Sequence, residues 1–182
     1  IKGASLAIDA CLQAGAGLDL VGDTQITNEP DYFEECRSKC DGKQIRMVGP
    51  ASRGECVWWM SQAHCLLHPN FPAPALGHPG FREPFGLAPV EAMACECPVI
   101  AGDFGAMRET IKDSVTGRVV RSFEEMVLSV KYCSFPDPVW DGERCADTWR
   151  KSCREQALNF TVDRMISRVE ELCKEAVEDG GW

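Results

Sequence analysis

Residues 98–101 read Pro-Val-Ile-Ala, a continuous apolar run with no polar residue to mark a side that faces solvent. A strand with one wet face alternates apolar and polar residues, so this run predicts a strand buried on both faces. Other short apolar runs, at 18–22, 44–50, 65–67 and 116–120, alternate with stretches of helical pattern. Strands that alternate with helices predict an α/β fold with a parallel sheet and helices on both faces.

The helical stretches have recognisable beginnings and apolar faces. Ser52 and Glu55 match a capping box, and the apolar face that follows consists of Val57, Trp58, Met60 and Ala63. We interpret Trp58 and Trp59 as core packing with one partly exposed ring; an aromatic platform for an acceptor is the alternative. We expect helices at 5–12, 30–40, 52–63, 122–132, 140–157 and 161–177. A chain of 182 residues is enough for one α/β domain and short for two, so residues 1–182 are interpreted as a single domain.

Composition excludes several classes of function. The net charge of −9 argues against a nucleic-acid groove and against binding to an anionic membrane. Eleven cysteines include no C-x-x-C pair, which argues against a metal site and favours free thiols in a reducing cytoplasm. No apolar run reaches the ~18 residues of a membrane-spanning helix, so no direct membrane anchor is expected.

The chemistry of the chain centres on residues 83–94, EPFGLAPVEAMA. Pro84 keeps Glu83 out of the helical region, whereas Pro89 is suited to the first helical position, so Glu91 is expected in the first turn of a helix. The N–H groups of residues 85–88 then lack helical partners, which predicts an anion site. Glu91 could accept hydrogen bonds from a ribose diol, and Glu83 could face a sugar.

Two other interpretations of this carboxylate pair stay open. Glu91 could merely favour the positive end of a helix dipole while Glu83 is solvated. The pair could also belong to a glycosidase, whose carboxyl groups lie roughly 5–9.5 Å apart, and spacing along the sequence does not settle that distance.

The E-x7-E pattern from Glu83 to Glu91, followed by CPVIAGDFGA, resembles the signature of retaining glycosyltransferases of family 4. The resemblance extends from Lys2-Gly3 through Gly117 and more loosely to the end. It implies a Rossmann-like, doubly wound parallel sheet, the C-terminal donor-binding half of the GT-B fold. It also implies that helices at about 140–178 cross to an N-terminal acceptor domain that this sequence lacks.

The resemblance assigns roles to individual residues. Glu83 would be the catalytic residue that orients the sugar or supports its cationic character, with no nucleophile role. Lys2 would contact the diphosphate of the donor, although a frayed terminal lysine is an alternative. The donor-binding residues implied are Lys2, Val48, Gly49, Pro50, Phe85, Gly86, Leu87 and Glu91. Gly49 could instead simply end a strand. His68 could approach the sugar, although a satisfied structural histidine is the favoured interpretation.

The sequence departs from the family in four places. It begins in a strand-to-helix turn where the family has a strand first, so we expect a gap in the sheet, and infer a fragment or a slot that another segment fills. Residues 70–82 are longer than usual, and we expect a flap there. Glu96 and Ala106 stand where the family usually has glycine, which puts the usual activity in question.

These observations lead to a first interpretation and several alternatives. The first is the donor-binding domain of a metal-independent, retaining glycosyltransferase that uses a UDP-, GDP- or ADP-sugar, needs no cofactor and is inactive or nearly so alone. The second is a non-catalytic module that binds a nucleotide sugar. A sugar-nucleotide epimerase and a glycogen phosphorylase relative are disfavoured by the E-x7-E context and by the absence of a pyridoxal lysine motif.

Overall fold

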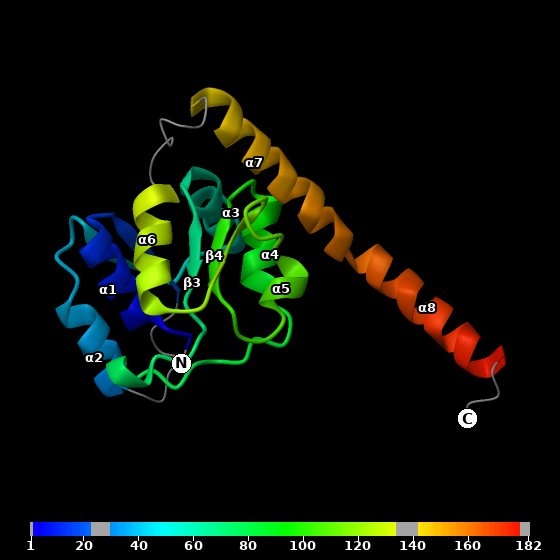
Figure 1. The fold of residues 1–182 in the computed structure, drawn as a ribbon, viewed down its shortest axis with the longest axis horizontal. Helices are drawn as coiled ribbons and strands as arrows, with labels where there is room; N and C mark the ends of the chain where they lie inside the picture. Colours follow the sequence, from blue (N-terminus) through cyan, green and yellow to red (C-terminus); the bar gives the residue numbers. More distant parts are fainter. Residues whose placement is uncertain (1, 23–29, 134–141, 179–182) are drawn as a thin grey trace.

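A computed structural model describes residues 2–22, 30–133 and 142–178 of the chain, and it has the α/β fold expected from the sequence (Figure 1). The strands are β1 (Leu18–Val21), β2 (Ile45–Gly49), β3 (Leu66–His68), β4 (Val99–Gly102) and β5 (Gly117–Val120). The helices are α1 (Ala4–Ala14), α2 (Pro30–Ser38), α3 (Arg53–Gln62), α4 (Leu87–Ala94), α5 (Met107–Thr110), α6 (Phe123–Cys133), α7 (Gly142–Ala157) and α8 (Val162–Glu178). Short 3-10 helices lie at Pro74–Leu76 and Leu158–Phe160.

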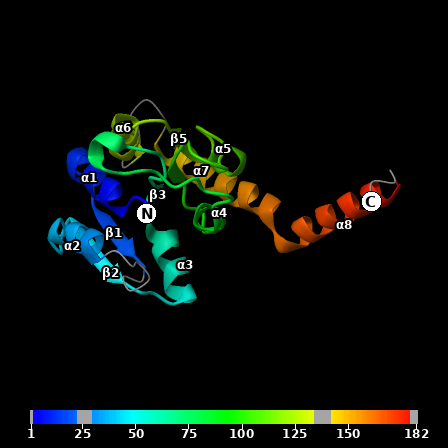
Figure 2. The same cartoon turned by 90° about the horizontal axis from the view of Figure 1, so that it is seen from below.

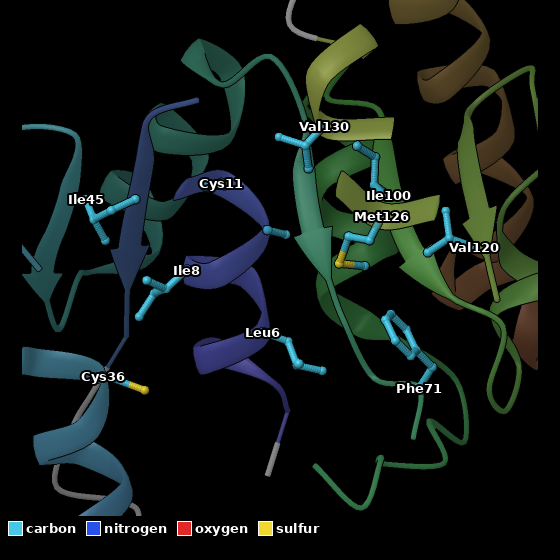
Figure 3. Packing of buried hydrophobic residues seen from close by; sticks show 11 residues of the cluster. Leu6, Ile8, Cys11, Cys36, Ile45, Phe71, Ile100, Val120, Met126 and Val130 are labelled. Atoms are coloured by element: carbon cyan, nitrogen blue, oxygen red, sulfur yellow. The ribbon is translucent and has the colours of Figure 1, made fainter. Parts of the chain in front are cut away.

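All strand pairs in the described residues are parallel, but they form two sheets rather than one. One sheet has the order β1-β2 and the other the order β3-β4-β5. No pairing joins β1 to β3 within the part of the chain that the structure describes. The two strands lie on either side of α1 in Figure 3, so the gap expected in the sheet is at this place.

The larger sheet has a packed core on each of its faces. One core lies under α1 and α6 and includes Leu6, Ile100 and Met126 (Figure 3). The other lies under α4, α5 and α7 and includes Met93 and Met107. Every residue of β4 is buried, which confirms the prediction from its continuous apolar sequence.

Several cysteines fill these cores as small apolar side chains. Burial raises the pKa of the Cys11 thiol to about 11 and that of the Cys97 and Cys153 thiols to about 12. Such thiols stay protonated at neutral pH and are poor nucleophiles. The side chains of Cys133 and Cys145 lie outside the described residues.

Helix α3 differs from the sequence prediction. Its capping box is present, since Ser52 N donates to Glu55 Oε2 at 2.7 Å. None of its residues is buried, however, and Val57 and Trp58 are 50% and 55% exposed. The prediction of core packing holds for Met60 and Ala63, which are partly buried against the core under α4 and α7, but it was wrong for Val57 and Trp58. Sequence periodicity identifies an apolar face but not how much of it is covered.

The start of α4 also differs from its prediction. The helix begins at Leu87, two residues before Pro89, with Gly86 as its N-cap. Proline is tolerated there because the first N–H groups of a helix have no helical acceptor. Glu91 is consequently the fifth helical residue, outside the first turn in which we expected it.

The terminal helices differ in how they are held. Helix α7 packs against α4 and α5, and Gln156 Nε2 donates to the carbonyl oxygen of Thr110 at 3.0 Å. Helix α8 projects from the body in both views (Figures 1 and 2) and has no buried residue. Its exposed apolar residues are Val162, Met165, Ile166, Val169, Leu172 and Val177. Among the described residues no helix has the length and apolar character needed to cross a membrane.

Candidate nucleotide-sugar site

The N-terminus of α4 is uncapped by protein groups. Gly86 adopts φ 93°, and a side chain there would place its Cβ 2.5 Å from Met107 Cε, so glycine suits this position. Among the described residues, no hydrogen-bond acceptor is found for the N–H groups of residues 85–88. Phe85 and Leu87 are 38% and 69% exposed. The N–H groups at which the sequence predicts an anion site are therefore not used by acceptors from the described part of the protein.

Glu83 is fixed by the turn that follows β4. Ala106 N donates to the carbonyl oxygen of Glu83 at 2.8 Å, and Glu83 and Gly105 form a parallel bridge. Gly105 has φ 89°, and an added Cβ would lie 2.6 Å from the backbone nitrogen of Glu83. The solvated alternative for Glu83 was wrong, since the residue is only 5% exposed.

Lys2 is paired with this buried carboxylate. Its Nζ donates to Glu83 Oε2 at 2.9 Å and lies 4.8 Å from the centre of the Phe81 ring. Gly3, with φ 81°, is packed so closely against the Pro69 carbonyl that a side chain would not fit. Lys2 is thus held in the structure rather than frayed, although its side chain is 59% exposed.

His68, for which the sequence favours a structural role and leaves an approach to the sugar open, lies next to Glu83. It ends β3, is 6% exposed, and its Nε2 lies 3.2 Å from Glu83 Oε2, within ion-pair distance but without a hydrogen bond. The sequence signal that could have identified it is a histidine at the carboxyl end of a buried strand, where α/β folds bind ligands.

The pKa values of His68 and Glu83 are shifted by burial and by neighbouring charges. Burial lowers the pKa of His68, and the Lys2 charge lowers it further, against an opposing effect of Glu83. Burial raises the pKa of Glu83, but the hydrogen bond and charge of Lys2, together with His68, bring it below its usual value. Glu83 is therefore a carboxylate and His68 a neutral imidazole at neutral pH.

The remaining predicted residues lie apart from this ion group. Glu91 is exposed on α4 and has no hydrogen-bond partner among the described residues. Gly49 ends β2 with φ 90°, and its carbonyl accepts from Gly22 N at 2.9 Å. Val48 is 39% exposed and Pro50 is also exposed. Within the described ranges, no hydrogen bond or ion pair links residues 48–50 to Glu83.

The two departures from family glycines have different structural consequences. Ala106 has φ −79°, which any residue adopts, and it still donates its N–H to Glu83. Glu96 has φ 63°, in the left-handed region that favours glycine. The departure at Ala106 is therefore harmless to the local backbone, whereas Glu96 introduces strain.

No cluster of three or more His, Cys, Asp or Glu side chains suited to a metal ion is found among the residues that the structure describes.

Comparison with protein-family models identifies the family of this chain. The family model described as "Glycosyl transferases group 1" matches residues 2–132. The chain belongs to this family. It is 34% identical over 100 residues to a D-inositol 3-phosphate glycosyltransferase of Salinispora arenicola, covering 54% of this chain and 21% of that protein. It is 24% identical over 174 residues to an uncharacterized glycosyltransferase, MJ1178, of Methanocaldococcus jannaschii, covering 96% of this chain and 45% of that protein.

Solved structures show that this glycosyltransferase chain has the fold of known GT-B enzymes over nearly its whole length. The Anabaena protein Alr3699/HepE, in complex with UDP and glucose, superposes with a TM-score of 0.74 at 22% identity, over 96% of this chain and 45% of that one. Sucrose-phosphate synthase of Thermosynechococcus elongatus gives a TM-score of 0.73 at 24% identity, over 98% and 43%. The glycosyltransferase chain thus spans less than half the length of these relatives.

Proposed function

We propose that this chain is the donor-binding domain of a retaining, metal-independent glycosyltransferase of family 4 that acts in the cytoplasm. The observation that carries the proposal is the buried Glu83 carboxylate, held 2.9 Å from Lys2 Nζ, three residues before the open N-terminus of α4. That combination places a cation, free N–H donors and an acceptor for hydroxyl groups on adjoining elements.

Each group has a distinct role in this proposal. The diphosphate lies at the N–H groups of residues 85–88, where the positive end of the helix favours an anion, and Lys2 contributes a further positive charge. The ribose diol donates to the exposed Glu91, and the backbone at 48–50 receives the base. The resemblance to complexes with UDP and glucose supports a nucleotide sugar as the ligand.

Catalysis by such a site consists of positioning and charge stabilisation. Glu83 accepts hydrogen bonds from the transferred sugar, and the α4 amides and Lys2 stabilise the diphosphate as it departs. The acceptor and any group that takes its proton belong to parts of the relatives' length that this chain does not span. We therefore propose that the chain alone binds a donor and transfers little or no sugar.

Calorimetric titration with UDP-glucose, a GDP-sugar and an ADP-sugar tests the proposal. We expect saturable binding of one base class, and a loss of at least about tenfold in affinity for Glu91→Ala, since a lost hydrogen bond to a diol is worth roughly 1.5 kcal/mol. Glu155→Ala, an exposed glutamate on α7, is the matched control and should bind as the wild type does. Binding of none of the three nucleotide sugars would overturn the proposal.

The second candidate is a non-catalytic module that binds a nucleotide sugar. The strained Glu96, at a position where the family usually has glycine, favours it. The two candidates separate when the chain is joined to the part of a glycosyltransferase relative that it does not span. Sugar transfer then supports the enzyme, whereas binding without transfer supports the module.

A further inference from the structure

Glu83 offers two oxygens with unequal surroundings. Two nitrogen atoms approach the same oxygen of Glu83, Oε2, with Lys2 Nζ at 2.9 Å and His68 Nε2 at 3.2 Å. No hydrogen-bond donor to Oε1 is found in the described part of the chain. Oε1 is therefore the oxygen available to a ligand. Oε2 is the oxygen that is paired with the Lys2 ammonium.

The two neighbours of Oε2 are held very differently. The Lys2 side chain is 59% exposed on a flexible stem, whereas the His68 side chain is only 7% exposed. Lys2 can therefore move toward a ligand while His68 cannot. The His68 Nε2 atom is buried and has no hydrogen-bond partner among the residues that the structure describes, so one polar atom beside the carboxylate is left unsatisfied there.

A bound diphosphate changes the charge balance of this group. It brings at least two negative charges to the end of the loop that carries Glu83, and these attract the Lys2 ammonium. A buried carboxylate that loses its only cation is strongly destabilised unless another cation replaces it. Lys2 and Glu83 are the charged groups whose interactions reach His68, so His68 is the group placed to respond.

We propose that His68 is a positioning residue which takes up a proton when a nucleoside diphosphate sugar binds, as Lys2 moves from Glu83 to the diphosphate. The proton comes from solvent and is added to the His68 ring, so that an imidazolium with its Nε2 3.2 Å from Glu83 Oε2 replaces the Lys2 charge beside the carboxylate. Glu83 stays ionised and oriented, with Oε1 directed to the sugar. This inference rests on the proposed function, since it assumes a diphosphate at the α4 N-terminus.

The direction of the proton movement follows from the surroundings of His68. In the free protein, burial and the Lys2 charge keep its pKa below the usual value, so the imidazole is neutral at pH 7. Departure of Lys2 removes one lowering effect, and the diphosphate adds a raising one. The pKa of His68 therefore rises on binding, and protons are taken up near neutral pH.

Calorimetric titration of the full chain with UDP-glucose, a GDP-sugar and an ADP-sugar measures this uptake. Each titration is repeated at pH 7.0 in phosphate, imidazole and Tris buffers, whose ionisation enthalpies differ. We expect the observed enthalpy to vary with buffer by an amount that corresponds to between roughly one half and one proton taken up per ligand. Three variants distinguish the source of the proton.

His68→Gln, which keeps a polar side chain that cannot titrate, should bind with no proton uptake. Lys2→Met should reduce the uptake, because its His68 no longer loses a neighbouring cation on binding. His64→Gln changes an exposed histidine that precedes β3 and should take up protons as the wild type does. A thermal unfolding scan of each variant confirms that it is folded before titration.

The outcomes separate the two proposals. Saturable binding of a nucleotide sugar without proton uptake in the wild type overturns the role of His68 and leaves the proposed function standing. Uptake that persists in His68→Gln also overturns it. Binding of none of the ligands overturns the proposed function, and this inference with it.

Discussion

Gly105→Ala tests whether the loop of Glu83 rests on the turn after β4. Gly105 has φ 89°, where an alanine costs about 1–2 kcal/mol. The added Cβ would lie 2.6 Å from the nitrogen and 2.9 Å from the carbonyl carbon of Glu83. These are backbone atoms that cannot rotate away, and overpacking of this kind costs a further 1–3 kcal/mol. We expect the free energy of unfolding to fall by about 2–5 kcal/mol.

Urea-induced unfolding followed by far-UV circular dichroism measures this loss as a shift of the midpoint at an unchanged slope. Ala106→Gly is the matched control next in sequence. Its φ of −79° suits any residue, so the free energy of unfolding should change by less than about 0.5 kcal/mol. If Gly105→Ala were as stable as this control, the close contact between the turn and Glu83 would not exist in solution.

Three further substitutions have expected outcomes. Glu96→Gly should raise the free energy of unfolding in urea by about 1 kcal/mol, because it relieves a left-handed φ of 63°; a lower stability would contradict the strain. Lys2→Met should raise the pKa of Glu83, whose lowered value stabilises the fold above about pH 4.3. The stability deficit should be about 1–2 kcal/mol at pH 7, less than for a fully buried pair because Lys2 is exposed. In thermal scans the deficit should begin to shrink near pH 4.3 and should vanish once the pH has fallen through the lowered pKa of Glu83; a deficit independent of pH would refute this cause. Val57→Ala should change the free energy of unfolding by less than about 0.5 kcal/mol in urea, since Val57 is 50% exposed, and a loss typical of a core valine would show that α3 is covered.

The sequence predicted the elements whose signals are local. The continuous apolar run at 98–101 predicted β4, and the Ser52–Glu55 pair predicted the start of α3. Gly86 predicted the bend before α4, although the helix begins two residues earlier than Pro89 suggested. The first N–H groups of a helix lack helical acceptors whether the helix starts at Leu87 or at Pro89. The sequence alone therefore could not decide between these two starts.

Features that depend on distant contacts could not be predicted in this way. The exposure of α3 depends on what covers it, and the ion group joins residues 2, 68 and 83 from three separate elements. His68 was given a structural role because one histidine at a strand end does not reveal a carboxylate fifteen positions later. The catalytic role of Glu83 stays a prediction, and so do the roles in donor binding of Lys2, Val48, Gly49, Pro50, Phe85, Gly86, Leu87 and Glu91.

The bond from Ala106 to Glu83 also determines which parts of the site can adapt to a ligand. Because the main chain of Glu83 is joined to the turn after β4, the two segments shift together or not at all. Small adjustments to ligands of different size must then come from torsions of side chains, and the Lys2 stem has the most freedom to rotate. The site thus combines a rigid backbone frame with one mobile charge.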